Sequence, residues 1–528
     1  MAALVARSRR SFTQRGAASL VAAGILLSRI AGLIRDRAFA HYLGNSAAAD
    51  AFRAAFRIPN FLQNLFGEGV LSASFIPVYA RLRAEKRDEE ASRLAEAIGA
   101  LLAVGTSLIV LLGILLAPVL IAAIAPGFKD DKRELTIAIV RILFPGAGLL
   151  VFSAWCLGIL NSHRKFFLSY AAPVVWNAAI ISTLIWKGPQ LDSSQLAMAV
   201  AWGSVVGSAL QFGVQLPVVL RLLSPLQAMW RSRSEHVNSV LTNFFPVFVS
   251  RGVVQISAYV DSLLASFLPT GAVAALSYAQ TLYSLPVSLF GMAVSAAELP
   301  AMSSAMGSDE EIATTLRSRL ENGLRQIAYF VVPSAVAFLI LGNVVVATIY
   351  QSGVFTERDV RYVWTVLAGA TVGLLASTSG RLYSSAFYAL RDTRTPLRFA
   401  IARVSLGLML GYLFALRAPG WLNFDRSWGV AGLTLASGIA GWVEFVLLRR
   451  ALRTRIGAVG SQLGYVLKLW AIALVAAAVA FGIEHVVRVG HPVIRGIIVL
   501  GAHGLIYIAV TSALGIAGPL NRLRGRRA

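Results

Sequence analysis

One stretch decides the fold. Residues 94–124 read LAEAIGALLAVGTSLIVLLGILLAPVLIAAI and contain a single charged side chain, Glu96. A helix needs roughly 20 apolar residues to cross the hydrocarbon core of a bilayer, so this stretch is long enough for one crossing. The whole chain shares its character, because 57% of the 528 residues are hydrophobic and only 14% are charged. This composition excludes an ordinary soluble protein or a disordered one and predicts a polytopic membrane protein.

Apolar runs separated by charged residues, prolines and glycines predict an all-α protein with about 14 transmembrane helices. The runs lie near 17–40, 50–80, 94–124, 135–160, 166–186, 196–220, 237–267, 272–304, 312–342, 360–389, 396–416, 428–448, 463–483 and 493–516. If the N-terminus is cytoplasmic, the cytoplasmic loops and tails hold about 29 Lys and Arg and the opposite loops about 9. This bias predicts that both termini are cytoplasmic, and it accounts for the net charge of +23 without a nucleic-acid partner.

Two pairs of similar segments indicate an internal repeat. Residues 160–165 (LNSHRK) follow the fourth run and 390–395 (LRDTRT) the tenth, while 75–77 (FIP) end the second run and 298–300 (ELP) the eighth. We expect two six-helix lobes related by a parallel pseudo-two-fold repeat, and the alternative is chance similarity between apolar helices. The expected organisation is a cytoplasmic N-terminal tail at 1–16, an N-lobe at 17–222, a C-lobe at 236–451, two further helices at 461–516 and a basic cytoplasmic tail at 517–528.

Charged side chains at bilayer depth are costly, so they should face a cavity or a partner. In the second run, charged side chains and two asparagines share one helical stripe, which consists of Asp50, Arg53, Arg57, Asn60, Asn64 and Glu68. Pro59 would kink that helix, and Gly32 between Arg29 and Arg35 would permit a bend in the first or a close contact with another helix. These features predict a wall of a wet cavity. The alternative is that the charges pair with one another near the membrane surface.

The chemistry of the spans indicates transport of an anion. Cations exceed carboxylates there, and Arg recognises phosphate through its planar fork. The sequence has no Walker motif and no catalytic constellation, so we predict a transporter and no enzyme, driven by an ion gradient or the membrane potential. The single cysteine, Cys156, excludes a disulfide framework.

The first two runs also resemble a known family. Their segments 28–36 (SRIAGLIRD), 49–52 (ADAF), 56–62 (FRIPNFL), 67–69 (GEG) and 74–77 (SFIP), with 387–396 (FYALRDTRTP) in the second half, are similar to the MurJ (MviN) family. The members are lipid II flippases of the MOP exporter superfamily. The resemblance implies 14 helices, a central cationic cavity, alternating access, and a groove in which helices 13 and 14 hold the undecaprenyl tail.

The resemblance also implies a binding site for the pyrophosphate. Arg29 and Arg35 match the two essential arginines of the family's first span, and Asp50 and Asn60 match functional positions of the second. Three positions depart from the family pattern: Gln63 and Thr281 stand where the family has arginine, and Ser284 where it has glutamate. Arg57, Arg251 and Arg381 are the candidates to replace the missing charge. The sodium site of some members would fall here on Asp261 and Asp392.

The leading hypothesis is therefore a flippase that moves lipid II from the cytoplasmic to the outer leaflet of the bacterial inner membrane. The alternatives are a flippase for another polyprenyl-linked saccharide, of the O-antigen or exopolysaccharide type, a drug or cation antiporter of the same fold, and a non-transporting membrane scaffold for cell-wall synthesis. We expect no resident cofactor, Na⁺ or H⁺ as the coupling ion, contacts with membrane lipids and cell-wall synthesis enzymes, and a monomer.

Overall fold

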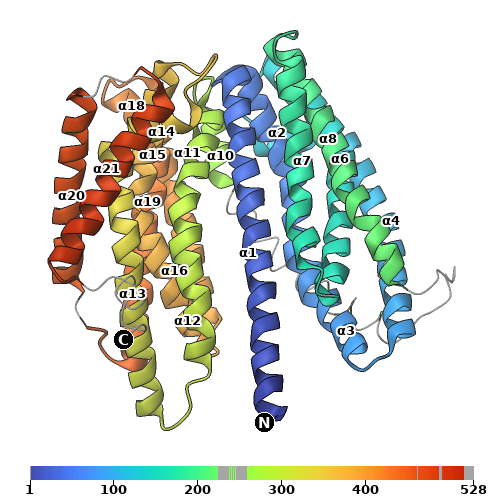
Figure 1. The fold of residues 1–528 in the computed structure, drawn as a ribbon. Helices are drawn as coiled ribbons and strands as arrows, with labels where there is room; N and C mark the ends of the chain where they lie inside the picture. The colour runs from blue at the N-terminus through green and yellow to red at the C-terminus, as the bar shows by residue number, and fades with distance from the viewer. Residues whose placement is uncertain are drawn as a thin grey trace. The chain divides into compact units, whose positions relative to one another are not determined.

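A computed structural model describes residues 2–223, 259–460, 462–486 and 490–516, together with Val237, Val240, Thr242 and Phe244. These residues are almost entirely helical, and the β pairing among them is one isolated bridge, between Ser352 and Phe355. The chain divides into two compact units, residues 1–263 and 264–528. The all-α prediction is confirmed (Figure 1).

The first unit is a helical bundle in which α6 contacts α2, α4, α7 and α8. Its elements are α1 (Ala2–Leu43), α2 (Ala47–Gln63), the π-helical η1 (Asn64–Leu71), α3 (Ser72–Ala84), α4 (Asp88–Leu115), α5 (Ala117–Ile124), α6 (Asp130–Ser162), α7 (Phe166–Lys187), α8 (Ser193–Leu222) and the start of α10 (Val260–Ser266). Helix α1 already begins at Ala2 and therefore runs through the predicted N-terminal tail.

The second unit repeats this pattern and adds two helices. Its elements are α11 (Ala272–Pro286), the π-helical η2 (Val287–Met292), α12 (Ala293–Ser303), α13 (Asp309–Ile340), α14 (Gly342–Tyr350), α15 (Glu357–Thr371), α16 (Leu374–Ala389), α17 (Arg394–Tyr412), η3 (Leu413–Arg417), α18 (Ala418–Trp421), η4 (Arg426–Trp428), α19 (Gly429–Ile456), α20 (Leu463–Val486) and α21 (Pro492–Ala513). The added pair, α20 and α21, packs on α13 and α14.

Local sequence signals explain where several helices begin. Asp192 accepts hydrogen bonds from the backbone N–H groups of Ser194 and Gln195 at the start of α8. Ser308 and Glu311 form a reciprocal capping box at the start of α13. Such caps satisfy backbone donors that have no partner within the helix.

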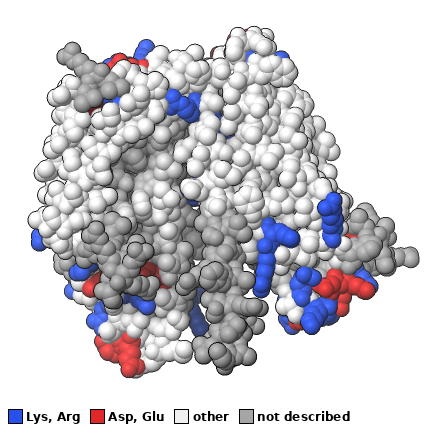
Figure 2. Space-filling view, viewed as in Figure 1, with Lys and Arg blue, Asp and Glu red and all other residues white. Residues whose placement is uncertain are grey.

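Ten helices among the described residues are long and apolar enough to cross a membrane, and the bent pair α15–α16 would make an eleventh. Charged residues at the ends of helices gather at the turns between them. Figure 2 shows Arg and acidic side chains together over the α3–α4 turn, where Arg81, Arg83 and Arg87 pair with acidic neighbours. The protein is thus a multi-pass membrane protein, and the total of 14 crossings stays a prediction. The seventh predicted run, 237–267, lies mostly outside the described residues, as does the tail at 517–528.

The two units share their helix breaks, which supports the predicted repeat. The π-helical segments begin at Asn64 and Val287, which are 223 positions apart, the same spacing as Pro77 and Pro300. Helix α4 ends before Leu116 and α13 before Leu341. The 33 residues of α6 correspond to Glu357–Ala389, which is divided into α15 and α16. The lobe boundaries proposed from the sequence stay a prediction.

The structure shifts one pairing within the repeat. The sequence comparison aligned Leu160 with Leu390, but the matching turns align Leu160 with Phe387. In the first turn the carbonyl of Leu160 accepts from the Lys165 N–H, and Arg164 has a φ of 58°. In the second the carbonyl of Phe387 accepts from the Asp392 N–H, and Arg391 has a φ of 59°. Both helices end in this left-handed cap, so geometry defines the register better than residue identity.

The structure differs from the sequence prediction at two expected helix breaks, Gly32 and Pro59. Helix α1 is uninterrupted at Gly32, and a Cβ there would meet no atom within 4 Å, so no other helix of the described structure packs closely on it. Helix α2 continues through Pro59 to Gln63, and the irregular segment begins at Asn64. A π-helical turn holds more residues than an α turn. The predicted polar stripe therefore does not continue past Asn64 to residue 68.

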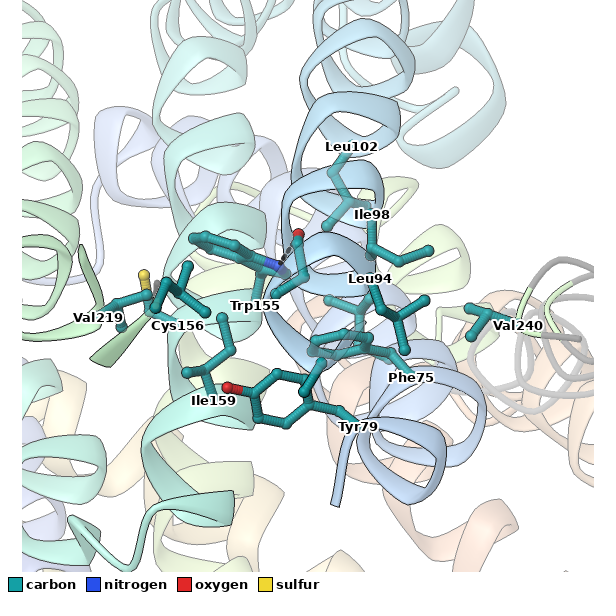
Figure 3. Packing of buried hydrophobic residues seen from close by; sticks show 14 of the residues in the cluster. Phe75, Tyr79, Leu94, Ile98, Leu102, Trp155, Cys156, Ile159, Val219 and Val240 are labelled. Carbon is teal, nitrogen blue, oxygen red and sulfur yellow. Dashed lines mark hydrogen bonds between the residues drawn. The ribbon is translucent and has the colours of Figure 1, made fainter. Parts of the chain in front are cut away.

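The core of the first unit lies where α3, α4, α6 and α8 meet (Figure 3). Phe75 and Tyr79 pack there against Leu94, and the Trp155 indole N–H donates to the carbonyl of Ala95 at 3.2 Å. Cys156 is fully buried in this cluster and serves as an apolar packing residue. This core fixes α6, whose other end carries part of the candidate site.

Candidate cationic site in the first unit

Asp36 is the centre of a buried ionic group at the end of α1. Its Oδ1 atom accepts hydrogen bonds from Arg35, at 3.3 Å from Nε and 3.1 Å from Nη2. The same oxygen accepts two more from Arg53 of α2, each at 3.2 Å. Asp36 and Arg53 are only 4% and 9% exposed, so water screens them little. Two guanidinium groups share one carboxylate, which leaves this group with a net positive charge.

A second ion pair ties α6 to the start of α2. The Lys132 ammonium group contacts the carboxylate of Asp50, which is fully buried. The same ammonium lies 4.1 Å from the centre of the Phe128 ring. Ser46 caps α2 by accepting from the Ala49 N–H, and Asp50 in the first turn suits the positive end of the helix dipole. Asp50 is therefore held in place by both Lys132 and its own helix.

Aromatic rings hold the Arg35 side chain from the other side. Phe52, Phe56 and Trp176 form a stack with ring centres 5.5 and 5.6 Å apart and an angle of 16° between neighbours. The Arg35 guanidinium carbon lies 5.1 Å from the centre of the Trp176 ring. The Trp176 N–H donates to Ser204 of α8, which fixes the indole. Cation–π contact and the Asp36 bonds together restrict Arg35 to one orientation.

Helix direction separates the remaining arginines from this group. Helix α1 runs toward the α1–α2 turn and α2 runs back, so Arg29 and Arg57 both lie further from the turn than Arg35 and Arg53. Arg29 is about 9 Å from Arg35 along the helix axis and has an exposed side chain. Arg57 is half-buried beside Tyr259, whose hydroxyl donates to the Arg57 carbonyl at 3.0 Å. Arg29 and Arg57 are better placed to meet a ligand than Arg53.

Of the predicted site on α1 and α2, Arg35 lies beside Asp36, Asp50 beside Lys132 and Arg57 beside Tyr259. Half-buried Asn60 and Gln63 lie further along α2. The structure also assigns partners that the sequence did not. Asp50 pairs with Lys132 of α6, and Arg53 pairs with Asp36 of α1. Asp36 was visible as a charge next to Arg35. Lys132 and Trp176 gave no signal, because their contacts join distant parts of the chain.

Two predicted site residues of the second unit, Thr281 and Ser284, are neutral and form hydrogen bonds within their own helix. The Thr281 hydroxyl donates to the Ser277 carbonyl at 3.1 Å, and the Ser284 hydroxyl donates to the Thr281 carbonyl at 2.8 Å. Arg381 has an exposed side chain. Arg251 lies outside the described residues.

The two carboxylates proposed for a sodium site have different surroundings. Asp392 caps α17: its carboxylate accepts from the N–H groups of Arg394 and Thr395 and from the Thr395 hydroxyl. The Thr395 N–H is the main reason why the pKa of Asp392 lies below its usual range. Asp261 lies on α10 and interacts electrostatically with Arg57. Within the described part of the chain, no three His, Cys, Asp or Glu side chains form a group that could hold a metal ion.

The fold is similar to that of solved transporters. A structure titled "Lipid II flippase MurJ, inward closed conformation" matches 94% of this chain and 98% of its own, with a TM-score of 0.76 and 24% identity. An inward-facing multidrug resistance MATE transporter of the MOP superfamily matches 81% of this chain and 94% of its own, with a TM-score of 0.65 and 18% identity. Two repeated helical units, with a buried cationic group in the first, thus define a membrane protein with the fold of the MOP transporters.

Sequence comparison identifies the family. The family model "Lipid II flippase MurJ" matches residues 39–499. The lipid II flippase MurJ of Burkholderia cenocepacia is 32% identical over 440 residues, which cover 81% of this chain and 82% of the relative. The probable lipid II flippase MurJ of Haemophilus influenzae is 30% identical, over 81% of this chain and 84% of its own. The chain belongs to the MurJ family, as its first two runs predicted.

Proposed function

We propose that this protein is a lipid II flippase, which moves the undecaprenyl-pyrophosphate-linked peptidoglycan precursor to the outer leaflet by alternating access. Family membership and the names of the relatives support this function. The observation that carries it is the positively charged group of Arg35, Asp36 and Arg53, with the more accessible Arg29 and Arg57 further from the turn on the same two helices. Such a group suits a pyrophosphate, because Arg binds phosphate oxygens in pairs.

In the first unit, some residues would bind the substrate and others would position them. Arg29, Arg35 and Arg57 would contact the pyrophosphate, and Asn60 and Gln63 would donate neutral hydrogen bonds on the same side of α2. Asp50, held by Lys132, and Asp36, held by two arginines, would position these donors. In the second unit, Thr281 and Ser284 are the proposed neutral polar positions for the substrate, and Arg251 is proposed as a further cation. The transport cycle needs no covalent chemistry.

The proposed setting is the bacterial inner membrane, with both termini in the cytoplasm. The excess of Lys and Arg in the assigned cytoplasmic loops supports this orientation. The α1–α2 turn, and with it the Asp36 group, would then lie toward the outer surface. Arg29 would lie deeper in the membrane than Arg35.

The proposed energy source is the membrane potential or an ion gradient, with H⁺ or Na⁺ as the coupling ion. For Na⁺, Asp261 is now the better candidate ligand, because the carboxylate of Asp392 is already engaged by α17 and lies 3.6 Å from Arg455. A sodium site at Asp261 predicts that Asp261→Asn removes any dependence of transport on sodium. Transport in vesicles that is indifferent to sodium would exclude it.

A second substrate class is favoured by one observation. Thr281 and Ser284 on α11 are neutral where the resembled family has arginine and glutamate, and this departure favours another polyprenyl-linked saccharide as the substrate. We also propose that the protein is a monomer and that it contacts cell-wall synthesis enzymes.

The experiment that tests this function is complementation of a strain depleted of its own lipid II flippase, together with lipid II translocation in vesicles. Arg29→Ala and Arg35→Ala should abolish both activities while the protein still inserts, and Arg35→Lys should impair them because Lys cannot make the bidentate contact. Arg361→Ala is the matched control, since Arg361 is exposed and pairs with Glu357 of its own helix. Full activity of both alanine variants would overturn the pyrophosphate site. Translocation of an O-antigen precursor but not of lipid II would establish the second substrate class.

A further inference from the structure

Helices α4 and α13 occupy equivalent places in the repeat, with residues 225 positions apart. Their core-facing sides agree: Ala95 and Leu102 are buried in α4, and their equivalents Leu320 and Ile327 are buried in α13. Both helices break at a leucine, Leu116 and Leu341, before a short second helix. Residues of α4 can therefore be compared with those of α13 one by one.

Helices α13 and α14 have a second buried side, which the added helices cover. Tyr329, Val336 and Val344 of this side are at most 3% exposed and pack against α20 and α21. The contact is also polar, because the Tyr507 hydroxyl donates to the Tyr329 carbonyl at 2.7 Å. Pro333 has no N–H to offer that carbonyl, so Tyr507 replaces the missing helix hydrogen bond.

The equivalent side of α4 and α5 is bare in the described structure. Val104, Leu111 and Val119 correspond to Tyr329, Val336 and Val344, and they are 59%, 54% and 64% exposed. Leu108 and Leu115 extend the same surface, at 55% and 63% exposed. The resulting spacing, 101, 104, 108, 111 and 115, is the 3–4 repeat of a helix that packs along another helix. We call this surface the α4 stripe.

The edge of this surface is also repeated. Glu321 of α13 accepts from the Gly460 N–H at 2.6 Å and so fixes the segment that leads into α20. Its equivalent in α4 is Glu96, which is half-buried at the same end of the helix. The α4 stripe therefore carries the apolar side and the terminal carboxylate that receive α20 in the second unit.

We propose that the α4 stripe docks a transmembrane helix of another membrane protein, with small residues on the docking side. The small residues follow from the equivalent contact, where α20 presents Ala473, Ala476, Ala477 and Ala480. Small residues let helices approach closely in a membrane, where packing drives association. A second copy of α4 would instead place leucine side chains against leucine side chains, which would keep the two helices further apart. Gly105 lies within the stripe, and a Cβ there would meet no atom within 4 Å, which leaves a notch for a close approach.

The test uses the α20 sequence as a probe. A biotinylated peptide of residues 463–486 is reconstituted in phospholipid vesicles with the full-length chain, in which Cys156→Ala removes the single cysteine. A benzophenone is attached at Leu111→Cys, or at Val206→Cys on α8, which is equally exposed at 54%. Photo-crosslinking to the peptide should be about fivefold higher at residue 111. Changing the four alanines of the peptide to leucine should remove the difference.

Several outcomes overturn the proposal. Equal yields at residues 111 and 206, or an equal yield with the leucine peptide, would mean that lipid alone covers the stripe. Crosslinks between two copies of the full-length chain at residue 111 would make a second copy the occupant. Leu115→Cys is the second labelling position if Leu111→Cys does not insert. Since lipid II translocation is measured separately, this test is independent of the proposed function.

Discussion

Helices α2 and α11 share a scaffold but differ in charge. Each leads into a π-helical segment, and the segments start 223 positions apart. At that spacing Asp50 corresponds to Val273, Arg53 to Leu276, and Arg57 to Gln280. The ionisable side chains of α2 are thus replaced by apolar or neutral ones in α11. The backbone irregularity belongs to the repeated scaffold, whereas the cationic chemistry belongs to the first unit.

This difference explains why the cations of α2 need such a firm support. Arg53 is buried and would be costly without Asp36, and Asp50 would be costly without Lys132. In α11 the polar groups are neutral: the Thr281 and Ser284 hydroxyls bond to their own helix, and the Tyr283 hydroxyl lies 2.7 Å from that of Ser377 on α16. The predictions below test this contrast.

The largest effect is expected for Asp36→Ala, which leaves two arginines without their shared carboxylate. Removing one partner of a buried ionic group costs about 3–5 kcal/mol of unfolding free energy. Thermal unfolding in detergent should show a large loss, whereas Glu357→Ala, at an exposed ion pair, should cost less than about 1 kcal/mol. Adding Arg53→Leu, the residue type of α11, should restore part of the loss. Wild-type stability of Asp36→Ala would contradict the buried group.

The second prediction concerns the aromatic support of Arg35. Trp176→Ala should reduce lipid II translocation about tenfold, because a desolvated cation–π contact contributes on the order of 1–2 kcal/mol. Trp176→Phe keeps a ring in the stack and should retain most of the activity. Trp202→Ala is the control, since Trp202 is 57% exposed on α8 of the same unit. Equal loss in both alanine variants would show that Trp176 has no particular role in positioning Arg35.

Sequence reasoning located the helices better than the contacts between them. Runs such as 135–160 and 463–483 became α6 and α20 within a few residues, because long apolar segments between charges have few alternatives in a membrane. The stripe on α2 was right only up to the π-helical segment, since a period of 3.6 assumes a regular helix. Lys132 and Asp50 are 82 residues apart, and no periodicity reveals such a pair.

The third prediction concerns the contact between α13 and the added helix α21, a contact that has no counterpart on α4 in the described structure. Tyr507→Phe leaves the Tyr329 carbonyl without the hydroxyl that replaces the N–H missing at Pro333, and this should cost about 1–2 kcal/mol. In a Pro333→Ala background the helix supplies its own N–H, so the same change should cost less. A double-mutant cycle on unfolding in detergent measures the difference. Equal costs in both backgrounds would mean that Tyr507 does not compensate for the proline.

The smallest expected effect is a difference between the two equivalent turns in how their stability depends on pH. His163 precedes the left-handed residue of the α6–α7 turn, and its ring nitrogen lies 2.9 Å from the Tyr79 hydroxyl. Burial, with Arg83 and then Lys165 as lesser causes and Asp88 opposing them, lowers the pKa of His163 below 6.5. The folded turn therefore binds fewer protons than the unfolded chain, and its stability should fall as the pH drops below about 6.5.

The α16–α17 turn should respond only at lower pH. The pKa of Asp392 there is lowered from 3.8, mainly by the Thr395 N–H, so its contribution is present above pH 3.8 and is lost only below that value. Hydrogen exchange corrected for intrinsic rates should show faster opening of the α6–α7 turn at pH 5 than at pH 7, with no change at the α16–α17 turn. His163→Gln should abolish the difference, because glutamine does not titrate. If both turns open faster at pH 5, the cause is general to the protein and does not lie in the protonation of His163.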